Sequence, residues 1–121
     1  MNKKRILLVD DESGFTTILK LSLPGFDVCA ENNPLQALET ARKFKPDMIF
    51  LDVIMPEADG GTIAAQFKED PILAKIPIIF LTAIVSGKEA ASKQEIGGYE
   101  FLAKPVSRDQ IVECIKKHLG A

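Results

Sequence analysis

Three short segments of this chain are almost wholly apolar, and a polar residue closes each of them. The segments, each with its closing residue, are 5–9 with Asp10, 48–51 with Asp52, and 77–81 with Thr82. Apolar runs of this length without alternation are typical of strands buried on both faces, which occur in parallel sheets. The chain is therefore constrained to a fold with a buried parallel sheet whose central strands end in polar side chains.

Two further segments, 26–30 and 99–103, alternate between apolar and polar residues, which is typical of strands near the edge of a sheet. Helical spacing of apolar residues separates the strands and predicts helices over 13–23, from Pro34 onward, after Gly61, over 87–95 and after Ser107. The expected buried positions include Phe15, Ile18 and Leu19 in the first helix, Leu35, Leu38 and Ala41 in the second, Ile63, Ala64 and Phe67 in the third, and Ile111, Cys114 and Ile115 in the last.

Alternation of five strands with five helices predicts an α/β fold, a doubly wound parallel five-stranded sheet with helices on both faces. Right-handed crossovers with the apolar strands in the centre favour the strand order 2-1-3-4-5. In such a sheet the chain reverses direction between strands 1 and 3, and ligands bind at the carboxyl ends of the strands there. Asp10 and Asp11 should therefore lie beside Asp52.

Length and composition predict one domain over residues 1–121, with 26% charged residues and a formal net charge of -2. That charge gives no reason to expect a nucleic-acid partner, and no segment is long and apolar enough for a signal peptide or a membrane span. Cys29 and Cys114 fall inside apolar patterns and match no metal or redox spacing. We therefore expect a reduced, cytoplasmic protein.

The carboxyl ends of the strands collect an unusual set of polar groups. They are three carboxylates (Asp10, Asp11, Asp52), one hydroxyl (Thr82) and one ammonium (Lys104). Like charges about 4 Å apart repel by about 4 kcal/mol at an effective dielectric constant near 20, so this set favours a bound cation. Mg²⁺, which prefers oxygen ligands, fits beside phosphate oxygens. The set has the parts for phosphoryl transfer to Asp52 as the nucleophile.

Each residue of this set also has an ordinary structural explanation. An aspartate after a strand often caps the next loop or helix, a threonine there is usually a turn residue, and a lysine before a proline is usually solvated. Their common position after parallel strands favours a shared site over five separate coincidences.

The chain resembles the receiver domain of two-component response regulators, the CheY-like family, over essentially its whole length. The resemblance is carried by the acidic pair Asp10-Asp11, the blocks 51–56 and 59–60, the strand end 81–83 and the segment 101–105 (Phe-Leu-Ala-Lys-Pro). It implies a flavodoxin-like (βα)5 fold in which Asp52 accepts a phosphoryl group from phosphohistidine. The donor would be a sensor histidine kinase or a histidine phosphotransfer protein, and a downstream protein or an output domain would receive the signal.

The same resemblance implies roles for individual residues. Asp11, Asp52 and the backbone carbonyl of Ile54 would bind Mg²⁺, with Asp10 acting through water. Lys104 and Thr82 would bind the phosphoryl oxygens, and Phe101 would be the aromatic switch. The Lys104–Pro105 bond is expected to be cis, a form that proline makes accessible.

Two features are specific to this chain. Ile54 and Ile84 stand where family members often carry polar side chains, and neither can orient an attacking water, so we expect a comparatively long-lived aspartyl phosphate. The predicted helix 87–95 offers mainly alanines for burial, which would make it weakly anchored and suited to switching.

Two other functions compete with the receiver interpretation. A Mg²⁺-dependent phosphatase of the haloacid dehalogenase type also uses an aspartate nucleophile with Thr and Lys, but it needs a second acid where Ile54 stands. A receiver that acts only as a docking module, without phosphorylation, is the other. His118 is expected to stabilise the end of the last helix rather than to donate phosphate.

Overall fold

A computed structural model describes residues 3–52, 60–82, 95–96, 99–104 and 106–120. The strands are β1 (Arg5–Val9), β2 (Asp27–Glu31), β3 (Met48–Asp52), β4 (Ile78–Thr82), β5 (Glu95–Ile96) and β6 (Tyr99–Ala103). The helices are α1 (Ser13–Leu21), η1 (Pro34–Gln36, a 3-10 turn), α2 (Ala37–Phe44), α3 (Gly60–Glu69) and α5 (Arg108–Leu119).

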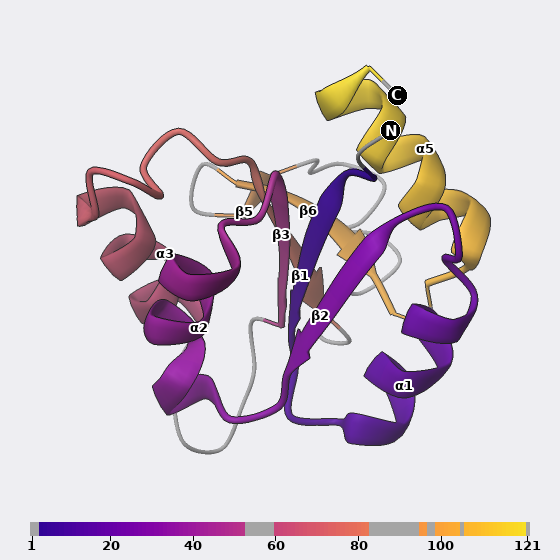
Figure 1. Cartoon of the computed structure of the whole chain (residues 1–121), viewed down its shortest axis with the longest axis horizontal. Helices are drawn as coiled ribbons and strands as arrows, with labels where there is room; N and C mark the ends of the chain where they lie inside the picture. The colour runs from indigo at the N-terminus through magenta and orange to yellow at the C-terminus, as the bar shows by residue number, and fades with distance from the viewer. Residues whose placement is uncertain (1–2, 53–59, 83–94, 97–98, 105, 121) are drawn as a thin grey trace.

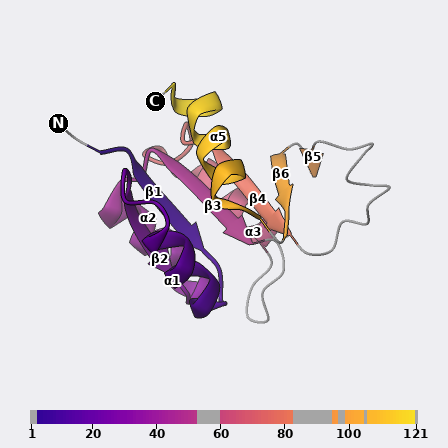
Figure 2. The same ribbon diagram turned by 90° about the vertical axis from the view of Figure 1, so that its right-hand side faces the viewer.

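Five parallel strands form the sheet in the order β2-β1-β3-β4-β6, which confirms the predicted order because β6 is the fifth parallel strand. The strands β1, β3 and β4 end on the same side of the molecule (Figure 2). The two-residue strand β5 pairs antiparallel with the outer side of β6 and was not predicted. Glu95 was expected to end a helix; it lies in β5 instead, because the edge of β6 offers backbone hydrogen-bond partners. Residues 83–94, over which the rest of that helix was expected, lie outside the described residues.

Helices cover both faces of the sheet, as predicted, with α2 and α3 on one side and α1 and α5 on the other (Figure 1). Alternate residues of β1 enter two separate cores: Leu7 and Val9 pack with residues of α2 and α3, whereas Ile6 and Leu8 pack with residues of α1 and α5. Because successive side chains point to opposite faces, a strand between two helical layers must be apolar throughout. This explains the unbroken apolar runs.

Two residues expected to be buried are exposed. Ile18 is 71% exposed because α1 turns Thr16 and Leu19 toward the sheet. Leu35 is also 71% exposed because it lies in η1, whose three residues per turn take it off the buried side of α2. Ala37 and Ala41 are buried in its place.

The last helix, α5, begins with a capping box. The Ser107 hydroxyl accepts a hydrogen bond from the Gln110 backbone N–H, and the Gln110 side chain accepts one from the Ser107 backbone N–H. None of the helices in the described part of the chain has the length and apolarity that crossing a membrane requires.

Candidate functional site

Asp10 and Asp52 lie side by side although 42 positions separate them in the sequence, because β1 and β3 are neighbours with Val9 opposite Leu51. Carboxylate oxygens of Asp10, Asp11 and Asp52 all lie within 4.8 Å of one another. Asp10 is 1% exposed and Asp52 4% exposed, whereas Asp11 is partly exposed. The predicted convergence of these three residues is therefore observed.

Hydrogen bonds from the end of β2 and from the start of α1 fix the position of Asp10. Its backbone N–H donates to the Glu31 carbonyl at 3.2 Å, and its side chain accepts from the Glu12 backbone N–H at 3.0 Å. The Asn32 side-chain amide donates to the Asp10 carbonyl at 2.8 Å and to the Thr16 hydroxyl at 2.9 Å. The end of β2 and the first turn of α1 thus hold this carboxylate in place before any ligand binds.

Lys104, which follows β6, reaches across the carboxyl ends of the strands into this acidic cluster. Its Nζ lies 2.7 Å from Asp10 Oδ2, 2.9 Å from Glu12 Oε1 and 3.7 Å from Asp52 Oδ2, and its side chain is only 12% exposed. Its ammonium also lies 4.7 Å from the centroid of the Phe15 ring, in a cation–π contact. Burial opposes the charge of Lys104, but its hydrogen bonds with Asp10 and Glu12 outweigh that effect and raise its pKa.

Three residues of this neighbourhood were not predicted from the sequence: Glu12, Phe15 and Asn32. Glu12 directly follows the acidic pair and could have been named from that position. Phe15 was assigned to the core through its helical spacing, and it does pack at the edge of the α1–α5 core. Asn32 carried no signal, because its role depends on how the end of β2 lies against β1.

Thr82 ends β4 opposite Ala103, the residue before Lys104, so its backbone lies at the same edge of the sheet. Phe101, the predicted switch residue, is 9% exposed and packs in the core under α2 and α3. The predictions about Ile54, Ile84 and the cis bond to Pro105 concern residues outside the described ones.

The donor set suits a hard divalent cation. Three carboxylates offer oxygen ligands within a few ångströms, and one ammonium does not balance their charge. Mg²⁺ takes such oxygen ligands and commonly shares them with phosphate and water. The Asp10–Asp11–Asp52 cluster could therefore hold a metal ion.

A doubly wound parallel sheet with an acidic site at the point where the strand order reverses defines a ligand-binding domain of the flavodoxin-like class. A family model described as the response regulator receiver domain matches residues 6–116, so the chain belongs to the receiver domain family of response regulators. Members of this family are signalling switches rather than conventional enzymes.

Known proteins agree with this assignment. The chain is 32% identical to the polar-differentiation response regulator DivK of Brucella anthropi, over 97% of both chains. It is 35% identical to the alkaline phosphatase synthesis transcriptional regulatory protein PhoP of Bacillus subtilis, covering 96% of this chain but 48% of that one. A crystal structure of a response regulator from Desulfuromonas acetoxidans superposes with a TM-score of 0.81, at 30% identity over 97% of each chain.

Proposed function

We propose that this chain is a phosphoaspartate switch of a two-component system or phosphorelay, in which Asp52 accepts a phosphoryl group from phosphohistidine. The observation that carries the proposal is the contact of a nearly buried Asp52 carboxylate with an acidic pair and a lysine at the edge of the sheet. Membership in the receiver family supports it. The donor would be a sensor histidine kinase or a histidine phosphotransfer protein.

In the proposed reaction, an oxygen of Asp52 attacks phosphorus in line as the bond from phosphorus to the histidine nitrogen breaks. The electron pair of that bond stays on the imidazole of the donor protein. Lys104 Nζ is already 3.7 Å from Asp52, so a small shift from its hydrogen bond with Asp10 would bring it onto a phosphoryl oxygen. Thr82 would donate a hydrogen bond to another phosphoryl oxygen.

The residues present fit Mg²⁺ at this site. Asp11, Asp52 and the backbone carbonyl of Ile54 would hold the ion, and Asp10 would do so through water. When bound, Mg²⁺ supplies positive charge that offsets the negative charge of the phosphoryl oxygens. Asp10 would also orient Lys104, with which it already forms a hydrogen bond of 2.7 Å.

The proposed output is a change in protein binding through a face that includes β6 and α5, to which the expected helix over 87–95 would contribute. Phe101 already packs in the core under α2 and α3, and a movement of Thr82 toward the phosphoryl group would favour this inward position and so couple the site to that face. The partner would be a cytoplasmic protein, or an output domain of the same polypeptide. The chain spans nearly the whole of the DivK relative and about half of the PhoP relative, and both arrangements are compatible with the proposal.

Intact-mass measurement after incubation with Mg²⁺ and acetyl phosphate tests the proposal. We expect the gain of one phosphate, absent in Asp52→Asn and prevented by EDTA. Asp109→Asn, which alters an exposed aspartate, is the matched control and should be labelled like the wild type. No labelling, or labelling that persists in Asp52→Asn, would contradict the proposal. Steady release of phosphate from many monoesters would instead indicate a phosphatase, and full biological output from Asp52→Ala would indicate a docking module.

The lifetime of the phosphorylated state is a second part of the proposal. Ile54 and Ile84 carry no group that could orient water toward the phosphoryl group, so hydrolysis should be slow. Ile54→Asn and Ile84→Glu should each shorten the half-life of the labelled protein at neutral pH. A wild type that loses its phosphate as fast as these variants would refute this part and leave the labelling result unaffected.

A further inference from the structure

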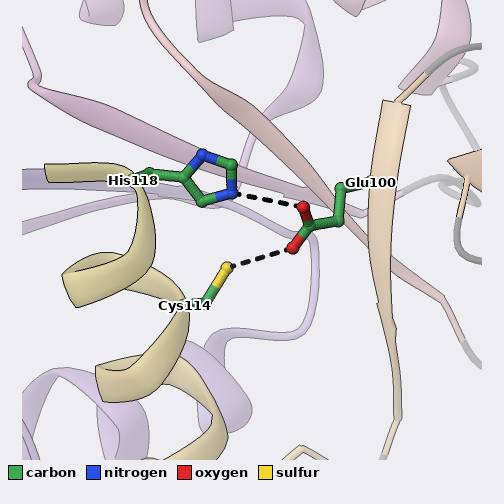
Figure 3. Close-up of side chains that lie close together, drawn as sticks. All are labelled: Glu100, Cys114 and His118. Carbon is green, nitrogen blue, oxygen red and sulfur yellow. Dashed lines mark hydrogen bonds and ion pairs between the residues drawn. The ribbon is translucent and has the colours of Figure 1, made fainter.

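A second cluster of potential metal ligands lies away from the aspartates, where α5 packs against β6. Cys114 and His118 are four residues apart on α5 and therefore on the same face of the helix, and Glu100 projects toward them from β6 (Figure 3). One ligand atom from each of the three residues lies within 4.8 Å of the other two. The spacing of the two cysteines does not indicate this site.

The separations in this cluster are close to those between ligands of a tetrahedral zinc ion. With zinc–ligand distances near 2.0–2.3 Å, tetrahedral geometry places a histidine nitrogen about 3.4 Å from a carboxylate oxygen and a thiolate sulfur about 3.6 Å from it. The observed distances are 3.3 Å from His118 Nε2 to Glu100 Oε1 and 3.9 Å from Cys114 Sγ to Glu100 Oε2. The two distances end on different oxygens of Glu100, so a rotation of this carboxylate, together with small movements of the other two side chains, would bring all three groups onto one ion.

Solvent reaches the cluster from one side. Cys114 is buried at 5% exposure, whereas the side chains of His118 and Glu100 are 25% and 27% exposed. An ion can thus enter past His118 and Glu100, with Cys114 as the inner ligand. The three side chains leave the fourth tetrahedral position for water.

We propose that Glu100, Cys114 and His118 bind one Zn²⁺ ion and that the ion fastens the carboxyl-terminal half of α5 to β6. The soft thiolate and the imidazole favour Zn²⁺ over Mg²⁺, so this site and the aspartate site select different ions. The site does not depend on phosphorylation of Asp52.

Binding displaces the thiol proton of Cys114. Burial, together with the nearby Glu100 carboxylate, raises the pKa of the Cys114 thiol to about 12, so this thiol is protonated at neutral pH in the absence of metal. Zn²⁺ takes the thiolate form, and the proton passes to the buffer.

Lys117 competes with the ion. Its Nζ lies 3.1 Å from Glu100 Oε1, the same oxygen that His118 contacts, and the ion would have to replace this ion pair. The Lys117 side chain is 65% exposed and can turn into solvent. Removal of its positive charge should therefore strengthen zinc binding, an effect opposite in sign to loss of a ligand.

Cobalt is the probe for the test, since a thiolate–cobalt charge-transfer band reports cysteine ligation directly. The whole chain, reduced and in excess Mg²⁺, should develop this band up to one equivalent of Co²⁺, and Zn²⁺ should abolish it. Cys114→Ser should lack the band. Two control variants should keep it: Asp52→Asn, and Cys29→Ser, which alters the partly buried cysteine on the opposite face of the sheet. His118→Gln should weaken binding by more than about tenfold, since even the loss of an outer partner of a metal ligand costs that much. Lys117→Met should bind more tightly than the wild type.

A thermal melt with and without Zn²⁺ provides the second readout, because an ion that binds only the folded chain raises the melting temperature. The increase should be present in Cys29→Ser and absent in Cys114→Ser. Absence of the band, its persistence in Cys114→Ser, or weaker binding by Lys117→Met would each overturn the proposal. Should Cys114→Ser fail to fold, the partly exposed His118→Gln and the exposed Lys117→Met variants decide the question.

Discussion

Replacement of Asp52 by asparagine should stabilise the folded chain when no divalent ion is present. Asparagine keeps the shape of the side chain and removes one of three carboxylates whose oxygens lie within 4.8 Å of one another. Among the described residues, the ammonium of Lys104 lies close to Asp10 and Asp52, and its shortest contacts are with Asp10 and Glu12 rather than with Asp52. Among these groups, the Asp10 and Asp11 carboxylates repel the charge of Asp52 and the Lys104 ammonium attracts it.

The distances set the size of this effect. At an effective dielectric constant of 20, two unit charges 4.8 Å apart repel by about 3.5 kcal/mol, and Asp52 experiences this from both Asp10 and Asp11. Attraction to Lys104 at 3.7 Å is worth about 4.5 kcal/mol on the same scale. Among these described charges, the repulsion from Asp10 and Asp11 exceeds the attraction to Lys104 by about 2–3 kcal/mol, and solvent around the partly exposed Asp11 screens part of the repulsion. We expect Asp52→Asn to raise the free energy of unfolding by about 1–2 kcal/mol, or the melting temperature by roughly 4–8 °C.

Urea denaturation in EDTA at low ionic strength measures the effect, with Asp109→Asn as the control because that aspartate is 89% exposed. The control should change the free energy of unfolding by less than about 0.5 kcal/mol. Saturating Mg²⁺ should narrow the difference in the free energy of unfolding between Asp52→Asn and the wild type. The ion binds the wild type, which has three carboxylates, more tightly than the variant and therefore stabilises the wild type more. An unchanged or less stable Asp52→Asn in EDTA, or a gap that Mg²⁺ leaves intact, would refute the reasoning.

Four further substitutions, in three experiments, test other parts of the structure. Lys104→Met should destabilise the metal-free chain, whereas Asp52→Asn should stabilise it. We expect a loss of about 3 kcal/mol in urea denaturation, because the substitution leaves the buried Asp10 carboxylate without its cation. Stability equal to that of the wild type would contradict the assigned ion pair. Asp70 accepts a hydrogen bond from Arg42, and this bond lowers the pKa of the Asp70 carboxyl in the folded chain. The ionised carboxyl should therefore stabilise the fold above about pH 4, the ordinary pKa of an aspartate. This stabilisation should disappear as the pH falls through the lower pKa that Asp70 has in the folded chain. The stability gap between wild type and Asp70→Asn, followed by urea denaturation at several pH values, should close in acid, and a gap independent of pH would exclude this linkage. Leu73→Ala should cost about 3 kcal/mol because Leu73 is fully buried, whereas Leu35→Ala should cost less than about 0.5 kcal/mol at 71% exposure; thermal melts of the two variants would disprove the burial pattern if their shifts were equal.

The sequence by itself determined the sheet and the position of the acidic site. Apolar runs closed by polar residues specify strands buried on both faces, and right-handed crossovers leave few orders for five such strands. Once β1 and β3 are neighbours, Asp10 and Asp52 must meet at their carboxyl ends. These conclusions depend only on patterns within the chain and on rules that hold for all parallel sheets.

Only the tertiary structure decided how side chains from different elements pair. Lys104 was expected at the site, but its hydrogen bonds to Asp10 and Glu12 depend on the direction in which it crosses from β6 toward β1. The meeting of Glu100 with Cys114 and His118 depends on how α5 is rotated against β6, and neither the strand nor the helix pattern records that rotation. Periodicity identifies the face that a residue occupies, whereas contacts at distances of 3–4 Å are set by packing between elements far apart in the sequence.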